Sequence, residues 1–111
     1  MTESEANAIL KAMSHPARMR ILRALRGGAL CAGKTNEAAR LSQPNLSQHL
    51  KILRESGLLN TARIGTRHCH YIALPTLVDA LLDALDAEHE EVVKSAEQVR
   101  SEACRREEEP P

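Results

Sequence analysis

The feature that most constrains this fold is a pair of short helical segments separated by only a few residues. The first spans residues 33–40, and the second follows it almost at once. In the second segment Leu46, Leu50 and Leu53 recur at intervals of four and three, so they share one face of a helix. Two helices joined by so short a turn form a helix-turn-helix unit, which we assign to residues 34–56.

Two further helices are predicted before this unit. Apolar residues at helical spacing indicate a first helix over residues 1–13. Ser14 suits an N-cap and Pro16 suits a first turn, so a second helix is expected to begin there and to end at Gly27.

A β-hairpin and a long helix are predicted after the unit. Two β-prone runs around Gly65 indicate a hairpin, or wing, over residues 58–74. One helix is then expected over residues 75–106, followed by a frayed acidic tail at 107–111. Residues 1–111 are therefore predicted to form a single domain, mainly α with a β-hairpin wing, of the winged helix-turn-helix class.

An apolar repeat of seven residues runs along the predicted helix over 75–106. One set of positions is Val78, Leu85, Val92 and Val99, and the second, offset by four, is Leu82, His89, Ala96 and Ala103. This repeat is typical of a helix that pairs with another helix. Because a small domain has little surface on which to bury so long a stripe, we predict self-association. The alternative is a single amphipathic helix that lies on its own domain.

The charges are divided unequally along a chain whose formal net charge is zero. Residues 1–74 carry eleven Lys and Arg against four acidic residues, which gives +7, and residues 75–111 carry the compensating −7. A basic body suggests a polyanionic partner. No stretch approaches a membrane span or a signal peptide, so we expect a cytoplasmic protein with no membrane partner, in which the three cysteines are reduced.

The outer face of the second helix of the unit carries side chains suited to reading double-stranded DNA. The residues expected to contact DNA there, at the start of the helix and opposite its leucines, are Ser42, Gln43, Asn45, Ser47, Gln48 and Lys51. Asn and Gln can bracket an adenine edge, while Ser and Lys reach bases or phosphates. Arg63 and Arg67 flank the hairpin tip, where two cations could clamp phosphates or enter a minor groove.

Several stretches in the same order resemble the ArsR/SmtB family of bacterial repressors. They are KAMSHPARMRIL at 11–22, LSQPNLSQHL at 41–50 and LRESGLL at 53–59, with Tyr71 near the end of the hairpin. The resemblance covers about residues 8–74. It implies a homodimer with the first and last helices, 1–13 and 75–106, at its interface, and two recognition helices in successive major grooves of an operator. It also implies release from DNA by an inducer, which is a metal, a metalloid or a thiol oxidant.

The expected inducer site departs from the family pattern. Members that sense arsenite or soft metals carry Cys-x-Cys at the third helix, but here Cys31 is followed by Gly33 in the second place. Acidic and histidine ligands of the zinc type are not reproduced on the last helix either. A lone thiolate is too small a ligand set for a tight soft-metal site, which needs three or four donors.

Three interpretations of the cysteines stay open. Cys31 and Cys104, from the same or from different subunits, could hold arsenite or a soft metal ion as inducer, or form a reversible disulfide. The run His68-Cys69-His70 could donate ligands, although alternate residues of a strand face opposite sides. The cysteines could also be inert, in a regulator whose sensor lies elsewhere.

Other function classes lack support in the sequence. It contains no Gly-rich phosphate loop and no HExxH, CxxC or GxSxG motif, so we do not expect an enzyme. The expected function is a DNA-binding repressor that an inducer releases by acting on cysteines. The rival is a winged-helix module that binds a protein instead of DNA.

Overall fold

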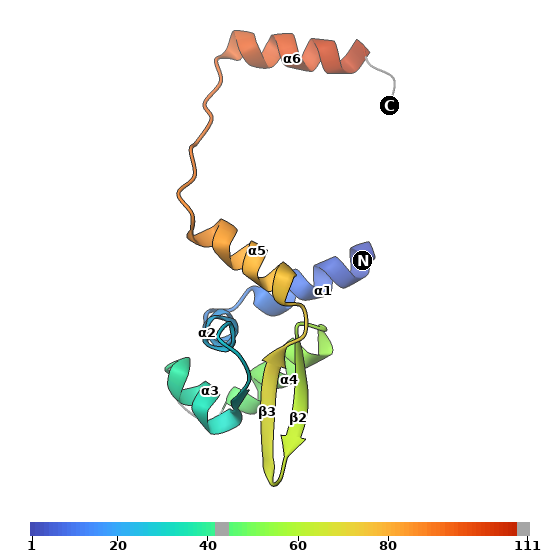
Figure 1. Ribbon diagram of the computed structural model, residues 1–111. Coiled ribbons are helices and arrows are strands. Elements are labelled where there is room, and N and C mark those ends of the chain that lie inside the picture. Colours follow the sequence, from blue (N-terminus) through green and yellow to red (C-terminus); the bar gives the residue numbers. More distant parts are fainter. Residues whose placement is uncertain (42–44, 109–111) are drawn as a thin grey trace.

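The computed structural model describes residues 1–41 and 45–108. Its elements, in chain order, are α1 (Glu3–Met13), α2 (Pro16–Leu25), β1 (Leu30–Cys31), α3 (Ala32–Ala38), α4 (Leu46–Glu55), β2 (Leu59–Ile64), β3 (Arg67–Ile72), α5 (Pro75–Asp86) and α6 (Ala96–Glu108). Figure 1 shows the hairpin of β2 and β3 projecting from the helices as a wing. The predicted mainly α fold with a β-hairpin wing is confirmed, with β1 and α6 as elements that the sequence analysis did not predict.

The core is built almost entirely from aliphatic side chains. Ile21, Leu22, Leu53, Leu58 and Leu82, from α2, α4, the start of the hairpin and α5, are completely buried. The sequence contains no Trp or Phe. Since each buried Leu or Ile contributes about 1.5–3 kcal/mol, this cluster holds the helices of the body together.

The strands form a small antiparallel sheet in the order β1-β3-β2. Gly65 has φ +62° at the first position of the two-residue hairpin loop, as a type II′ turn requires. The edge strand β1 pairs Leu30 with His70 and Cys31 with Cys69. Two residues are too few to show the alternation that predicts a strand, so β1 left no local signal.

Several predicted boundaries shift where a different residue caps the helix. α1 begins at Glu3, with Thr2 and Glu5 forming a reciprocal capping box. α2 is capped by His15 and not by Ser14, because the His15 Nδ1 accepts the Ala17 N–H at 3.0 Å.

The third helix is also shorter than predicted. α3 covers Ala32–Ala38 instead of 33–40, because Arg40 adopts a left-handed conformation with φ +54°. The Leu41 N–H then bonds to the Asn36 carbonyl oxygen, which closes the helix end. α4 begins at Leu46, and its expected start at Ser42 lies outside the described residues.

The single long helix predicted over 75–106 is wrong. α5 ends at Asp86, residues 87–95 are not helical, and α6 then runs to Glu108, beyond the expected start of the frayed tail. Figure 1 shows an extended segment that carries α6 away from the rest of the chain. The heptad positions therefore do not form one continuous stripe.

Local interactions explain the break. Ser95 and Gln98 form a capping box that starts α6, with the Ser95 Oγ accepting the Gln98 N–H and the Gln98 Oε1 accepting the Ser95 N–H. Val92 and Val93 are both exposed, so burial does not offset the helix-disfavouring effect of β-branching. Acidic residues also gather near the C-terminus of α5, where the helix dipole disfavours negative charge.

Three ion pairs link α5 to α2 and its C-cap, and Val78 and Leu82 of α5 are buried in the core. Arg26 contacts Asp79 at 2.9 Å and Asp83 at 2.7 Å, and Arg23 contacts Asp86 at 2.6 Å. Within residues 1–41 and 45–108 no helix is long and apolar enough to cross a membrane.

Candidate functional site

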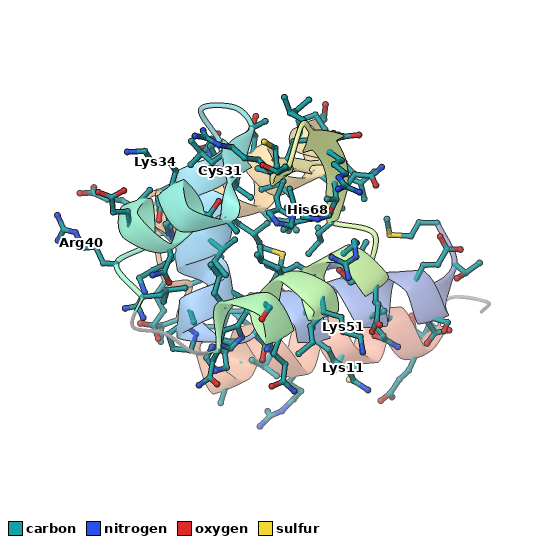
Figure 2. All side chains as sticks on the ribbon, turned by 90° about the horizontal axis from the view of Figure 1, so that it is seen from below. Lys11, Cys31, Lys34, Arg40, Lys51 and His68 are labelled. Atoms are coloured by element: carbon teal, nitrogen blue, oxygen red, sulfur yellow. The ribbon has the colours of Figure 1, made fainter. Side chains whose placement is uncertain are left out.

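α4 separates its apolar and polar side chains as the sequence predicts. Leu46, Leu50 and Leu53 are buried against the core. The opposite face exposes Asn45, Ser47, Gln48 and Lys51. Figure 2 shows Lys51 on the outside of the helix, viewed from below the molecule. α4 and its N-cap residue therefore present a row of hydrogen-bonding groups and one cation on the exposed side of the helix.

The beginning of this row is described only in part. Ser42 and Gln43, which were predicted to contact DNA, lie outside the described residues, so their role stays a prediction. Asn45 stands at the N-cap of α4, but its side chain makes no capping hydrogen bond there. Lys51 makes a loose contact with Glu55 at 3.9 Å, with both side chains well exposed. Such a pair contributes little and leaves the ammonium available for a ligand.

The two wing arginines lie at the tip of the hairpin. Arg63 faces His68 across the two strands, and Ile64 faces Arg67. Both arginines are exposed, and the Arg63 Nε donates to the Gly65 carbonyl oxygen at 3.2 Å. The wing can therefore bring two guanidinium groups to a polyanion that also contacts α4.

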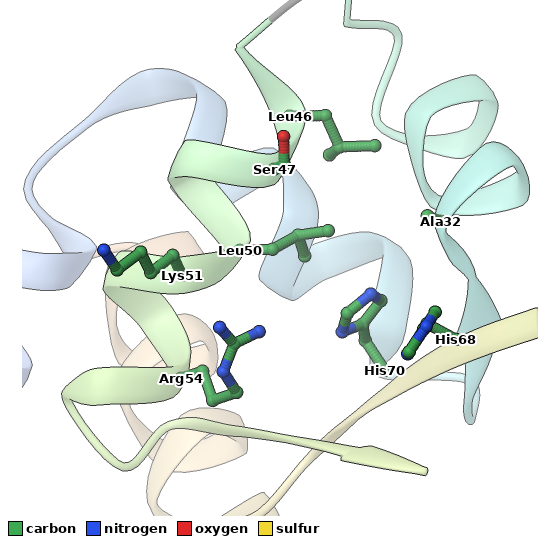
Figure 3. A pocket seen from close by; sticks show the side chains of 8 residues that line it. All are labelled: Ala32, Leu46, Ser47, Leu50, Lys51, Arg54, His68 and His70. Carbon is green, nitrogen blue, oxygen red and sulfur yellow. The ribbon is translucent and has the colours of Figure 1, made fainter. Parts of the chain in front are cut away.

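A cleft of about 520 Å³ separates α4 from β3 (Figure 3). Its lining consists of Ala32, Leu46, Ser47, Leu50, Lys51, Arg54, His68 and His70. The cleft thus combines apolar side chains of α3 and α4 with charged or titratable side chains on both walls. Lys51 and Arg54 come from α4, and His68 and His70 come from β3. Arg54 and His68 are not predicted from the sequence as members of this cleft, because only the folded wing brings β3 opposite α4.

His70 is the buried polar residue of the cleft. It is 5% exposed, and its Nδ1 lies 3.2 Å from the Thr61 hydroxyl. Burial lowers the pKa of His70, and the positive charge of Arg54 and the neighbouring His68 lower it further. His70 therefore favours the neutral form, and its contact with Thr61 joins β3 to β2 within the wing.

A second histidine contact joins the starts of α2 and α4. The rings of His15 and His49 lie 4.6 Å apart, and a guanidinium nitrogen of Arg18 lies 3.5 Å from the His49 Nδ1. Burial, His15 and Arg18 all lower the pKa of His49. The half-buried Arg18 therefore makes its contact with another residue of the protein. Arg20, in contrast, is exposed.

The three cysteines are free thiols at unequal positions. Cys31 and Cys69 are half-buried and lie directly opposite each other on β1 and β3. Cys104 is exposed on α6, so one chain does not bring it to Cys31. Among residues 1–41 and 45–108 no three His, Cys, Asp or Glu side chains gather as a metal site.

An apolar hollow of about 280 Å³ lies between α1 and α5. It is lined by Leu10, Met13, Ser14, Met19, Leu81, Ala84 and Leu85. Leu10 is 56% exposed and Leu85 is 62% exposed, although both are large apolar side chains. Exposed apolar groups of this kind mark a surface suited to contact with another apolar surface.

This chain is similar to known bacterial regulatory proteins. The model of the family described as "Bacterial regulatory protein, arsR family" matches residues 15–61. The arsenical resistance operon repressor of Staphylococcus xylosus is 39% identical over 72 residues, which cover 65% of this chain and 69% of that protein.

Two solved structures have a similar fold. The transcriptional repressor BigR from Xylella fastidiosa is 32% identical, with a TM-score of 0.66 over 77% of this chain and 90% of that one. The homodimeric winged helix-turn-helix DNA-binding domain of Mb0332 from Mycobacterium bovis is 26% identical, with a TM-score of 0.64 over 80% of this chain and 89% of that one.

Proposed function

The chain belongs to the arsR family of bacterial regulatory proteins, and we propose that it is a repressor that binds double-stranded operator DNA as a homodimer. The observation that carries this proposal is the exposed polar row of α4, which lies opposite three buried leucines. A helix of this kind can enter a major groove while its apolar side stays in the core. No catalytic role is proposed.

Each part of the surface has a separate role in this proposal. Asn45, Ser47 and Gln48 contact base edges or position the helix, and Lys51 neutralises a phosphate. Ser42 and Gln43, which the sequence predicts to contact DNA, complete the proposed contact set. Arg63 and Arg67 hold the DNA backbone from the wing. The basic excess of residues 1–74 favours this encounter electrostatically.

We propose the surface of α1 and α5 as the homodimer interface. The exposed Leu10 and Leu85 beside the apolar hollow support this choice, as does the homodimeric domain from Mycobacterium bovis. Leu85→Asp should give a monomer in sedimentation experiments, because it would bury a charge at the interface. Val99→Asp on α6 is the matched control and should stay dimeric. If Val99→Asp gives a monomer and Leu85→Asp stays dimeric, the dimer interface lies on α6 instead.

DNA binding is tested by selecting a duplex site from a random library and then titrating it at several salt concentrations. For a protein that makes several phosphate contacts, log affinity should fall with log salt by ~0.9 per contact. Gln48→Ala should relax the preference at one base position, which corresponds to about 1–3 kcal/mol of discrimination. Ser101→Ala on α6 is the control. If no duplex is bound at low salt, the winged-helix protein-interaction module becomes the better description.

We further propose that a thiol-directed inducer, either an oxidant or arsenite or a soft metal ion, releases the repressor. The half-buried Cys31 at the start of α3 supports this proposal, because α3 is the first helix of the DNA-binding unit. Release requires that the inducer stabilise a state with lower operator affinity. If the operator complex of the Cys31→Ser variant is still released by every such compound, the sensor is not Cys31.

A further inference from the structure

We infer that Cys31 and Cys69 form one modification site, a cross-strand dithiol that closes to an internal disulfide and thereby weakens operator binding. The pairing follows from the register of the sheet, in which these two residues are direct partners on β1 and β3. The disulfide itself is independent of the proposed function, and only its effect on DNA rests on that function.

The geometry brings the two thiols within reach of each other. Direct partners on antiparallel strands have Cα atoms about 4.5–5.5 Å apart, inside the range of about 4.4–6.8 Å that disulfides span. Their side chains leave the same face of the sheet, with Cβ atoms about 4.5–5.5 Å apart against about 3.5–4.5 Å in a disulfide. Closure therefore needs an approach of roughly 1 Å, by the difference of these ranges.

The surroundings of the pair favour this small movement and the access of an oxidant. β1 has only two residues and lies at the edge of the sheet, so it can approach β3 without breaking a long ladder. The next residue across β3, Ala62 on β2, is also small. All three are half-buried, so the thiols are partly accessible from solvent.

The reaction balances with a peroxide as the oxidant. The thiolate of one cysteine attacks hydrogen peroxide, which gives a sulfenic acid and the first molecule of water. The second thiol then displaces the sulfenic hydroxyl group, which leaves as a second water while the S–S bond forms. The peroxide accepts two electrons, and the two thiol protons leave in the water. A dithiol reductant reverses the change.

The position of the pair connects this reaction to the DNA-binding unit. Cys31 is the N-cap residue of α3, so a shift of β1 moves the start of this helix directly. Cys69 lies between His68 and His70, which line the cleft beside α4. The disulfide would therefore change the position of both α3 and the wing relative to α4, the helix that we propose enters DNA.

Peptide mapping tests the site itself. Trypsin separates the two cysteines into peptides 27–34 and 68–94, and leaves Cys104 in peptide 101–105. Reduced full-length protein is treated with hydrogen peroxide, its remaining thiols are blocked, and its digest is analysed by mass spectrometry. We expect a reducible link between the first two peptides in the wild type and in Cys104→Ser, and none in Cys31→Ser or Cys69→Ser. Unlinked peptides in Cys104→Ser, or a link only to Cys104, would overturn the proposal.

Operator titration of the same samples tests the consequence. Oxidised Cys104→Ser should bind its operator roughly 5–150-fold more weakly than the reduced form, and dithiothreitol should restore the affinity. Cys69→Ser/Cys104→Ser should not respond. A disulfide that leaves affinity unchanged would refute the coupling. If the reduced protein binds no duplex, the proposed function fails, while the peptide map still decides whether the dithiol exists.

Discussion

α5 and α6 arise from one apolar heptad repeat, yet the two helices differ in how they are held. In α5, Val78 and Leu82 are completely buried, and Arg23 of α2 and Arg26 at its C-cap form ion pairs with the acidic face of α5. In α6 no residue is buried, and Val99 remains 50% exposed. Spacing alone therefore does not extend a helix, because most helical stability in proteins comes from packing against another element.

The largest expected difference concerns the apolar residues of the two helices. Leu82→Ala should lower the free energy of unfolding by about 2–5 kcal/mol, because it opens a cavity in the core. Val99→Ala, its counterpart in α6, should change that free energy by less than about 0.5 kcal/mol. Urea denaturation at a fixed protein concentration measures both. Similar losses would mean that α6 packs against another surface in solution.

The second contrast concerns the lysines. Lys51→Ala should weaken operator binding and lower the slope of log affinity against log salt by ~0.9, because one phosphate contact is lost. Lys94→Ala should leave both quantities unchanged, since Lys94 is paired with Glu102 at 2.7 Å in the acidic segment. Fluorescence anisotropy titrations at several salt concentrations measure this. An equal effect of both variants would place the C-terminal segment on DNA.

Local pattern predicts the elements of this protein well where one surface of the element is buried. The spacing of Leu46, Leu50 and Leu53 correctly indicates α4 and the face that it buries. The β-prone runs around Gly65 correctly indicate the hairpin. In these places the periodicity of the sequence and the packing of the fold coincide.

What the sequence does not reveal depends on contacts between distant positions. The pairing of Cys31 with Cys69 requires β1 to join the sheet, and nothing within either segment specifies that contact. Arg54 and His68 likewise meet only across the cleft between α4 and the wing. α5 ends at Asp86 because residues 87–95 do not pack against another element of the described structure. The apolar repeat in the sequence gives no indication of this.

A smaller effect concerns the buried His70 and the pH dependence of stability. The pKa of the buried His70 is lowered from an ordinary value of 6.5, so the unfolded chain binds a proton before the folded chain does as the pH falls. Stability is therefore complete above about pH 6.5 and decreases below it. His70→Gln should make this decrease shallower, because it removes the group whose pKa burial lowers. Unfolding curves between about pH 5 and 7 test the sign, because a steeper decrease in His70→Gln would contradict it.

The smallest expected effect separates charge from packing at the contact of α2 with α5. Arg26→Met removes the ion pairs with Asp79 and Asp83 but keeps an apolar stem of similar length. The melting temperature should fall slightly at low salt, and the difference from wild type should vanish near 1 M salt, where charges are screened beyond about 3 Å.

Lys94→Met, which removes the ion pair with Glu102, should not change the melting temperature at either salt concentration. This pair holds only the start of α6, and no buried surface depends on it. If Arg26→Met lowers the melting temperature equally at low and high salt, its contribution to holding α5 is packing of the arginine stem. The difference between α5 and α6 would then be entirely one of buried surface.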